Sequence, residues 1–394
     1  MVSPALPAAT GAPIRSSERP SPEADDGSRT WRLLCWFAFT IPFSIFIAEV
    51  VLVATAAAAI ADWWRSGRPR PRTPLDVPIA CFVLSGLVAA FLGLDTLQSL
   101  WGLRTYLQIV IVYLVYAYAR GTPRAMTLVQ FFLSGMLIAA GYTVLMALSP
   151  WPLPRLFLGQ MTQSGQLLFA IGLCLPLMLH RVLWPRAMPV ALAVTLLALL
   201  ANLKRGVWLG AFVTVLTIGG LVSRRLVVVA GLILALLATT VPPVRARIEN
   251  SVRDLLLPGN RYDIWIAAID VVHRFPMGVG RKNGAILRDY PNIPQHHKHA
   301  HNNLLQITLE GGALGLATFL WWMGSFARLS WRTCRKIPPE DVAARSLAVA
   351  VFASFVGFHT AGLFEYNFGD SEVLEIFFLM MGIGLRLEAD SRAV

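Results

Sequence analysis

The chain has 394 residues, of which 56% are hydrophobic and only 14% are charged. A soluble domain carries about 25% charged residues, so this composition excludes an ordinary soluble protein. It predicts an all-α polytopic membrane protein, because lipid leaves no partner for open backbone. The formal net charge of +12 lies largely in short loops between apolar runs, where positive charge sets topology. No basic helix with interleaved aromatic residues occurs outside these runs, so we expect no nucleic-acid partner.

The N-terminal part of the chain predicts a tail followed by a helical pair. Residues 1–30 are rich in Pro, Ser and Ala, and we expect them to form a disordered cytoplasmic tail. The apolar run at 31–64 would span roughly 51 Å as one helix, which is too long for a bilayer core of about 30 Å. Pro42 and Ser44 lie near its middle and favour two short spans joined by a tight turn.

Further apolar runs bring the prediction to about twelve transmembrane helices. They lie at about 75–94, 101–119, 124–148, 162–181, 187–203, 206–222, 225–241, 301–327, 345–364 and 371–387. The predicted organisation has spans one to nine in 31–241 and a large loop with short surface helices at 242–300. Spans ten to twelve follow in 301–387, and residues 388–394 form a cytoplasmic tail.

Basic residues favour one orientation of these spans. Every even-numbered span is followed by a basic loop, the first beginning with Arg65 and the last including Arg335 and Lys336. These loops and both termini are therefore predicted to be cytoplasmic, and 242–300 to be periplasmic. Lys204-Arg205 opposes the rule, because the pair lies in a short outer turn. It either anchors the span ends by snorkelling or binds an anionic ligand on that side.

The long loop contains one clear helix start. Asn260 is a suitable N-cap, and Asp263 at the third helical position favours the helix dipole. An apolar face beginning with Ile264 and Trp265 is suited to lying along the membrane surface. Arg261 falls in the first turn, where it either faces an anion together with the backbone N–H groups or is simply solvated. We expect the loop to be too short for a core of its own.

Four of the seven histidines fall within 296–301, directly before span ten. Imidazole ionises nearest neutrality, so a histidine such as His301 is suited to proton transfer at the membrane surface. The cluster is also compatible with a solvated run or a metal site. We expect no metal, because no Cys is nearby and no H-x-x-x-H pattern lies on a helix. Polar neighbours have capping or solvation as alternative roles; they are Asn302, Asn303, Glu310, Glu365 and Asp370.

Arg205, Arg261 and the pair His299 and His301 all lie at span ends on the predicted outer face. Arginine presents a planar fork that matches phosphate oxygens, and a histidine beside it could remove a proton from a hydroxyl. Two phosphate-binding arginines and a base are what glycosyl transfer from a lipid-linked diphosphate sugar requires.

Three motifs carry a resemblance to a known family. His301-Asn302-Asn303-Leu304-Leu305 and Glu310 to Gly315 resemble the H-N-x-x-L…E-x-G-x-x-G signature of the O-antigen ligase/polymerase superfamily. Arg261 with Trp265, followed by 275–280, resembles its R-x-x-x-W…P-hydrophobic-G-x-G block. Residues 204–210 resemble its S-R-G-x-W-x-G block, with Lys204 where serine is common. Twelve spans with one large periplasmic loop between spans nine and ten also match.

The resemblance implies a metal-independent, inverting glycosyltransferase of the bacterial inner membrane that needs no cofactor. Its donor would be a polysaccharide on undecaprenyl diphosphate, and for the ligase that we favour below the acceptor would be lipid A-core. The family's roles place the diphosphate on Arg205 and Arg261 and make His301 the base. We expect six further residues to contact substrate: Lys204, His299, Asn302, Asn303, Trp265 and Arg281.

Three acceptors compete within this superfamily, and we favour the ligase over an O-antigen polymerase or a protein O-oligosaccharyltransferase. Protein-glycosylating members usually carry extra C-terminal sequence, whereas this chain ends shortly after span twelve. A transporter or flippase for lipid-linked sugars is the alternative from another class. Transporters commonly place charges near the bilayer midplane. Here the polar residues gather at one face, which favours surface chemistry.

Overall fold

A computed structural model describes residues 28–67, 70–154 and 156–393 of the chain. Over these ranges the protein is helical, and none of the described residues forms a strand. Most of the expected tail at 1–30 lies outside the described residues. Residues 28–30, the end of that expected tail, are described and are helical rather than disordered, because α1 (Ser28–Thr40) begins at Ser28.

Each predicted apolar run contains a helix. The run at 31–64 divides into α1 and α2 (Ile45–Ser66), with the break at 41–44 around Pro42 and Ser44 as expected. The others are α3 (Asp76–Leu92), the segment Thr96–Tyr118 (α4 Thr96–Gly102, η2 Leu103–Ile109 and α5 Val110–Tyr118), α6 (Gly121–Leu148), α7 (Gln160–Leu179), α8 (Met188–Ala201), α9 (Arg205–Val222), α10 (Arg224–Thr240), α14 (Asn303–Lys336), α15 (Val342–Ala361) and α16 (Ser371–Ala393). The last of these continues through 388–393, the expected C-terminal tail.

Fewer of these helices are long and apolar enough to cross a bilayer by themselves. Seven in the described part of the chain meet that condition, and the count reaches eight if α10 and α11 (Pro242–Glu249), which meet at a 97° bend, form one broken span. Two more, α3 and α8, are apolar but shorter. The fold is therefore that of a polytopic helical membrane protein, and twelve membrane spans stay a prediction.

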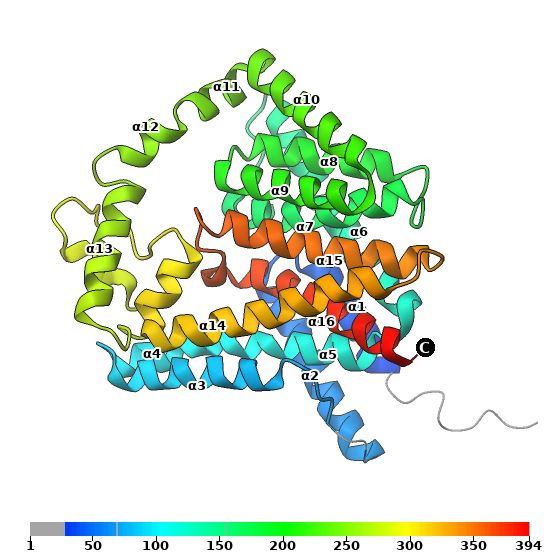
Figure 1. Cartoon of the computed structure of the whole chain (residues 1–394), viewed down its shortest axis with the longest axis horizontal. Helices are drawn as coiled ribbons and strands as arrows, with labels where there is room; N and C mark the ends of the chain where they lie inside the picture. Colours follow the sequence, from blue (N-terminus) through cyan, green and yellow to red (C-terminus); the bar gives the residue numbers. More distant parts are fainter. Residues whose placement is uncertain (1–27, 68–69, 155, 394) are drawn as a thin grey trace, which may run out of the picture.

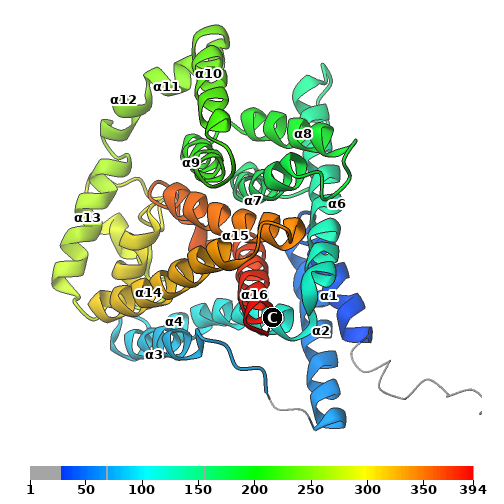
Figure 2. The same ribbon diagram turned by 45° about the vertical axis from the view of Figure 1, so that its right-hand side comes forward.

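The main core lies where α7 and α15 run through the middle of the bundle (Figures 1 and 2). Within their most apolar stretches, 83% of α7 and 67% of α15 is buried inside the protein. Helix α15 packs against α7 and α9, while α14 packs against α3. At the end of the bundle where α9 and α14 begin, this core supports the residues singled out by the motifs.

The segment 242–300 forms an arch along one side of the bundle, continuing from α10 (Figure 1). It contains α11, α12 (Ser251–Leu256), α13 (Arg261–Arg274) and the 3-10 helix η3 (Gly284–Asp289). This loop contributes most of a second apolar cluster, which it shares with α14. The cluster joins Ile264, Ala267, Ala268, Val271, Val279, Leu287, Ile293, Ala300 and Leu309.

The apolar face of α13 differs from the expectation. Ile264 and Ala268 are buried in this second cluster, where they pack inside the protein and are unavailable to the membrane surface. Ile269, on the same helix, is 45% exposed. The predicted helix start is confirmed, because the Asn260 side chain accepts a hydrogen bond from Arg261 N and Asp263 accepts one from Gly259 N.

Candidate active site

Two of the sequence motifs meet through their backbones. Gly312 adopts φ +65° and ψ −166° and interrupts α14, so that Leu309 and Glu310 lose their partners in the helix. Their carbonyls instead accept hydrogen bonds from Val279 N at 2.9 Å and Gly280 N at 3.0 Å. The approach requires glycine, since a Cβ on Gly312 would lie 2.3 Å from the carbonyl oxygen of Pro276. The P-hydrophobic-G-x-G and E-x-G blocks are thus one structural unit.

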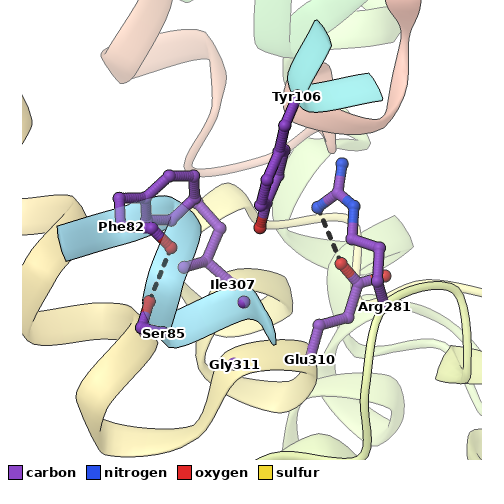
Figure 3. Close-up of a pocket in the computed structure, with 9 residues that line it drawn as sticks. Phe82, Ser85, Tyr106, Arg281, Ile307, Glu310 and Gly311 are labelled. Carbon is purple, nitrogen blue, oxygen red and sulfur yellow. Dashed lines mark hydrogen bonds and ion pairs between the residues drawn. The ribbon is translucent and has the colours of Figure 1, made fainter. Parts of the chain in front are cut away.

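A buried ion pair fixes this unit to the bundle (Figure 3). Arg281 Nη1 lies 2.8 Å from Glu310 Oε2, and the two side chains are only 7% and 6% exposed. Arg281 Nη2 also donates to the carbonyl oxygen of Phe368 at 2.9 Å, while Tyr366 and Gln306 donate to Glu310. Arg281 was expected to bind substrate, but here its terminal nitrogens contact protein groups and hold three elements together.

The start of α14 is tied to the turn between α15 and α16. Asn302 caps the helix by accepting from Leu305 N at 3.0 Å, which confirms the capping alternative, and its amide donates to the carbonyl of Leu363. Asn303 is buried, its N–H donates to the carbonyl oxygen of Gly362 and its side chain accepts from Phe368 N. Both asparagines therefore position the residue that precedes them, His301.

Arg261 points from the first turn of α13 to that same turn. Its Nη2 lies 2.8 Å from Glu365 Oε1, in an ion pair whose arginine is 23% and whose glutamate is 5% exposed. Solvation in an external turn was one alternative for Glu365, and its burial contradicts that alternative. The Glu365 carboxylate is one of the buried charges of the site, and Arg261 is its only ion-pair partner at this distance among the described residues.

His301 faces the other oxygen of Glu365. Its Nδ1 lies 3.9 Å from Oε2, and neither atom has a hydrogen-bond partner among the described residues. On the other side of the ring, Nε2 lies 3.3 Å from Nδ1 of His297. His301 itself has a left-handed backbone, φ +48°, directly before the Asn302 cap. Arg261, Glu365 and His301 thus form a connected group on three different elements.

His299 packs beside this group, with its ring edge-on to that of His301 and the two centroids 4.1 Å apart. Burial, and then the neighbouring His301, lowers the pKa of His299 to about 4. The imidazole is therefore neutral near pH 7. Across 28–67, 70–154 and 156–393, no three His, Cys, Asp or Glu side chains are arranged to hold a metal ion. Ala300, which lies between His299 and His301, is anchored by Trp265, whose Nε1 donates a hydrogen bond to the Ala300 carbonyl oxygen at 2.9 Å.

The turn from α8 to α9 brings Arg205 to the same place. Leu203 has a left-handed backbone conformation, and Lys204 is the N-cap residue of α9. Trp208 Nε1 donates a hydrogen bond across the turn to the carbonyl oxygen of Leu199. The glycine of this motif allows close packing, because a Cβ on Gly206 would lie 3.2 Å from Cγ of Glu365. Arg205 pairs with Asp254 of α12, with Nη1 2.9 Å from Oδ2.

Arg205 and Arg261 line one open cavity of about 370 Å³. Its polar end holds the two arginines, with Asp254 and Asn260. Its apolar wall comes from α9 and α10, through Leu209, Phe212 and Leu234. The other predicted site residues lie outside its lining, although His301 and His299 adjoin it through Glu365 and Arg261. The cavity can hold an amphipathic anion, with its charge on the guanidinium groups and its apolar part along the helices.

These features define a class: a helical membrane protein with a basic, apolar-walled cavity at one end of its bundle. Residues 190–320 match the O-antigen ligase family. This range is about a third of the chain and includes Arg205, Arg261 and His301. It confirms the resemblance to the O-antigen ligase superfamily.

Two curated proteins are also similar to part of the chain. Both are described as candidate polysaccharide ligases, one from Rickettsia prowazekii and one from Rickettsia typhi. Each is 35% identical over 69 residues, which is 18% of this chain and 15% of the relative. The aligned region is therefore a small part of either protein.

Glu365 is the site residue that sequence reasoning missed. It lies outside the family match and 104 residues from Arg261 along the chain. The available signal was a carboxylate at the edge of an apolar run, in Phe364-Glu365-Tyr366, where a solvated acid is the usual interpretation.

Proposed function

We propose that this protein is a lipopolysaccharide O-antigen ligase of the bacterial inner membrane. It would transfer O-antigen polysaccharide from undecaprenyl diphosphate to lipid A-core at the periplasmic face. The observation that carries the proposal is the shared cavity of Arg205 and Arg261, which has a basic end and an apolar wall. A polyprenyl diphosphate combines the same two properties in one molecule.

Donor binding follows from the chemistry of the lining. The guanidinium forks of Arg205 and Arg261 match the oxygens of a diphosphate, and the first turn of α13 adds its N–H groups. Leu209, Phe212 and Leu234 offer the polyprenyl chain an apolar path between α9 and α10. Two fixed positive charges would also stabilise the leaving diphosphate, so the proposed step needs no metal ion or cofactor.

His301 supplies the base in this scheme. A proton on Nδ1 directed at Glu365 Oε2 leaves the Nε2 lone pair free to take the proton of the acceptor hydroxyl. The hydroxyl would replace His297 next to Nε2. Its oxygen attacks the anomeric carbon while the bond from that carbon to the diphosphate oxygen breaks. Attack opposite the leaving group inverts the anomeric centre.

Glu365 links the base to the donor site. One of its oxygens holds Arg261, and the other faces the imidazole of His301. The negative carboxylate would stabilise the imidazolium that forms during transfer. Lys204 precedes Arg205 in the chain, and its ammonium would add positive charge near the phosphates.

Deletion of the gene in its host separates the related reactions. A ligase deletion removes the lipopolysaccharide ladder and leaves lipid-linked polymer, whereas a polymerase deletion leaves lipid-linked single repeat units. The names of the Rickettsia relatives favour the ligase. An unchanged ladder would contradict both and favour protein glycosylation or transport.

Purified variants test the assigned roles. His301→Ala should lower the transfer rate about 10²–10⁴-fold while leaving donor binding nearly intact, because a base acts in the transition state. Arg205→Ala and Arg261→Ala should weaken donor binding as well, and lysine should rescue poorly. His299→Ala is the matched control for the cluster and should be milder. Near-normal transfer by His301→Ala would contradict the assignment.

Labelling tests the proposed orientation. In a variant without native cysteines, Asn250→Cys in the loop should react with an impermeant thiol reagent in spheroplasts. Arg70→Cys should react only after lysis, since its loop is predicted to be cytoplasmic. The reverse pattern would place the site on the wrong side for a periplasmic ligase.

A further inference from the structure

A second cavity opens at the same end of the bundle, on the other flank of the α8–α9 turn. It has a volume of about 190 Å³ and lies between the end of α6, the start of α7 and the end of α8. Its lining includes the side chains of Tyr142, Thr143, Phe157, Gln160, Gln163 and Asn202. None of the motifs discussed above accounts for this cavity.

The floor of the cavity is a fixed polar group. Gln163 is 3% exposed, and its Oε1 accepts hydrogen bonds from Thr143 Oγ1 at 2.8 Å and Asn202 Nδ2 at 3.0 Å. Its Nε2 donates to the carbonyl oxygen of Ala139. The side chains that make the floor are therefore locked in one orientation before any ligand binds. Such preorganisation favours specific recognition.

Hydrogen-bonding capacity remains free above this floor. The Asn202 Oδ1 accepts no hydrogen bond from the described residues, and the exposed Gln160 amide makes none with them either. One wall is aromatic, because the rings of Tyr142 and Phe157 meet edge to face with centroids 5.3 Å apart. Amides with free groups beside aromatic faces suit a ligand with many hydroxyls and an apolar ring face.

This lining contrasts with that of the arginine cavity. The described residues around the second cavity are all uncharged, whereas Arg205, Arg261 and Asp254 line the first. A neutral sugar ring fits the second set of side chains, and a phosphate fits the first. The volume is of the order that a single sugar unit needs.

The two cavities are close enough to serve one reaction. Asn202 lines the second and Arg205 the first, and three residues of chain span at most about 11 Å. The start of α7 is also tied to the turn before α16, through Thr162 Oγ1 to Asp370 Oδ2 at 2.7 Å. That turn follows the segment that holds Glu365. A short oligosaccharide can bridge this separation.

We propose that the cavity between α6, α7 and α8 is a saccharide subsite, which binds a neutral sugar unit of a glycan substrate while transfer occurs at His301. The inference rests on the proposed function. The sugar belongs either to the acceptor oligosaccharide or to the polymer on the donor, and the two sources share the same chemistry. The subsite would hold one glycan at a set distance from the diphosphate.

Filling the cavity tests the proposal. Ala147 is exposed on α6 and lines the cavity, so Ala147→Trp should occlude it without disturbing the core. Leu145→Trp is the matched control, because Leu145 is 55% exposed on the same helix and lies outside the lining. With purified full-length protein, transfer is measured while either donor or acceptor is varied. Binding of undecaprenyl diphosphate without sugar is measured separately.

Ala147→Trp should raise the KM for one glycan substrate about 10- to 100-fold, because two or three hydrogen bonds to the sugar are lost. The effect on kcat should be smaller. Binding of sugar-free undecaprenyl diphosphate should stay unchanged, which also shows that the variant is folded. A higher KM for lipid A-core would assign the subsite to the acceptor. A higher KM for the polymer-bearing donor would assign it to the donor. Gln160→Ala should act in the same direction more weakly.

Equal KM values for Ala147→Trp and Leu145→Trp would overturn the subsite, provided that the unmodified protein transfers polymer. A loss of sugar-free undecaprenyl diphosphate binding would overturn it too, because the cavity would then belong to the lipid. If the unmodified protein transfers no polymer to lipid A-core, the proposed function fails instead. The two failures are therefore distinguishable.

Discussion

The two walls of the arginine cavity are built in opposite ways. One wall, formed by the start of α13 and by Phe364, rests on a support in which α14 pairs with 276–280 at Gly312 and the Arg281–Glu310 pair is buried. The wall formed by α10–α12 has no buried residue in α10 or α12. Its ion pair with the site, Arg205 with Asp254, is 23% and 31% exposed.

This difference assigns different tasks to the two walls. The proposed proton transfer needs His301 and Glu365 at fixed distances, which a well-packed support favours. The proposed donor, a lipid with a long glycan, would have to enter and leave, and a loosely packed wall beside the apolar path favours this. Figures 1 and 2 show α10–α12 at the outside of the bundle, with α10 beside α9.

Breaking the buried pair should have the largest effect. Glu310→Ala leaves the Arg281 guanidinium buried without its carboxylate, which should cost about 3–5 kcal/mol in the free energy of unfolding. Asp254→Ala breaks the exposed pair and should cost about 0–1 kcal/mol. Thermal unfolding of both variants in detergent measures the comparison. Equal losses would show that the two walls are equally rigid.

Removing the charge next to the base should come second. Glu365→Gln keeps an oxygen for Arg261 but loses the carboxylate that faces His301, so the transfer rate should fall about 10- to 100-fold. The effect should fall on kcat more than on KM, and it should shift the pH dependence of kcat. Asp370→Asn is the control, since that carboxylate binds Thr162 in the same turn. A normal kcat for Glu365→Gln would remove Glu365 from the mechanism.

The lowered pKa of His299 predicts a pH-dependent stability. Between pH 6.5 and about 4 the unfolded chain binds a proton on this residue that the folded protein does not, so the free energy of unfolding should fall as pH falls. The free energy of unfolding should change by about 1 kcal/mol per pH unit in this range. His299→Asn should flatten this pH dependence, measured by unfolding at pH 7 and pH 5.

The smallest effect is expected on the loosely packed wall. The Asp254 carboxylate occupies the Arg205 guanidinium that a diphosphate would use. Asp254→Asn should therefore tighten donor binding about two- to fivefold, in line with the small free energy of an exposed pair. Glu249→Gln removes a carboxylate from α11 whose ion-pair partner among the described residues is Arg245, and it should change nothing. Weaker donor binding by Asp254→Asn would indicate that Asp254 positions Arg205 for the donor.

Local sequence signals predicted the local features well. The break around Pro42, the N-cap at Asn260 and the helix in each apolar run depend on neighbouring residues, and the structure has them. The arginines at 205 and 261 were grouped by topology, and they do share a cavity.

Features that depend on distant contacts could not be predicted. Glu365 belongs to the site only because the turn before α16 packs against α9 and α13, and Arg281 is buried only because its partners come from α14 and that turn. The second apolar cluster likewise needs Leu309 of α14 to complete it. Nothing in the spacing of one segment reveals these partners.

The interruption at Gly312 separates the anchoring of His301 from the bilayer. Residues 313–336 would form a rod about 36 Å long, which exceeds a hydrocarbon core of about 30 Å and must tilt to fit. In a continuous helix, each change of tilt with membrane thickness would displace the start of α14 and His301 before it. Because the helix is broken and its short first segment pairs with 276–280, the position of His301 depends on that pairing as well as on the tilt of 313–336. The proposed catalytic geometry should therefore be less sensitive to lipid chain length than in a continuous helix.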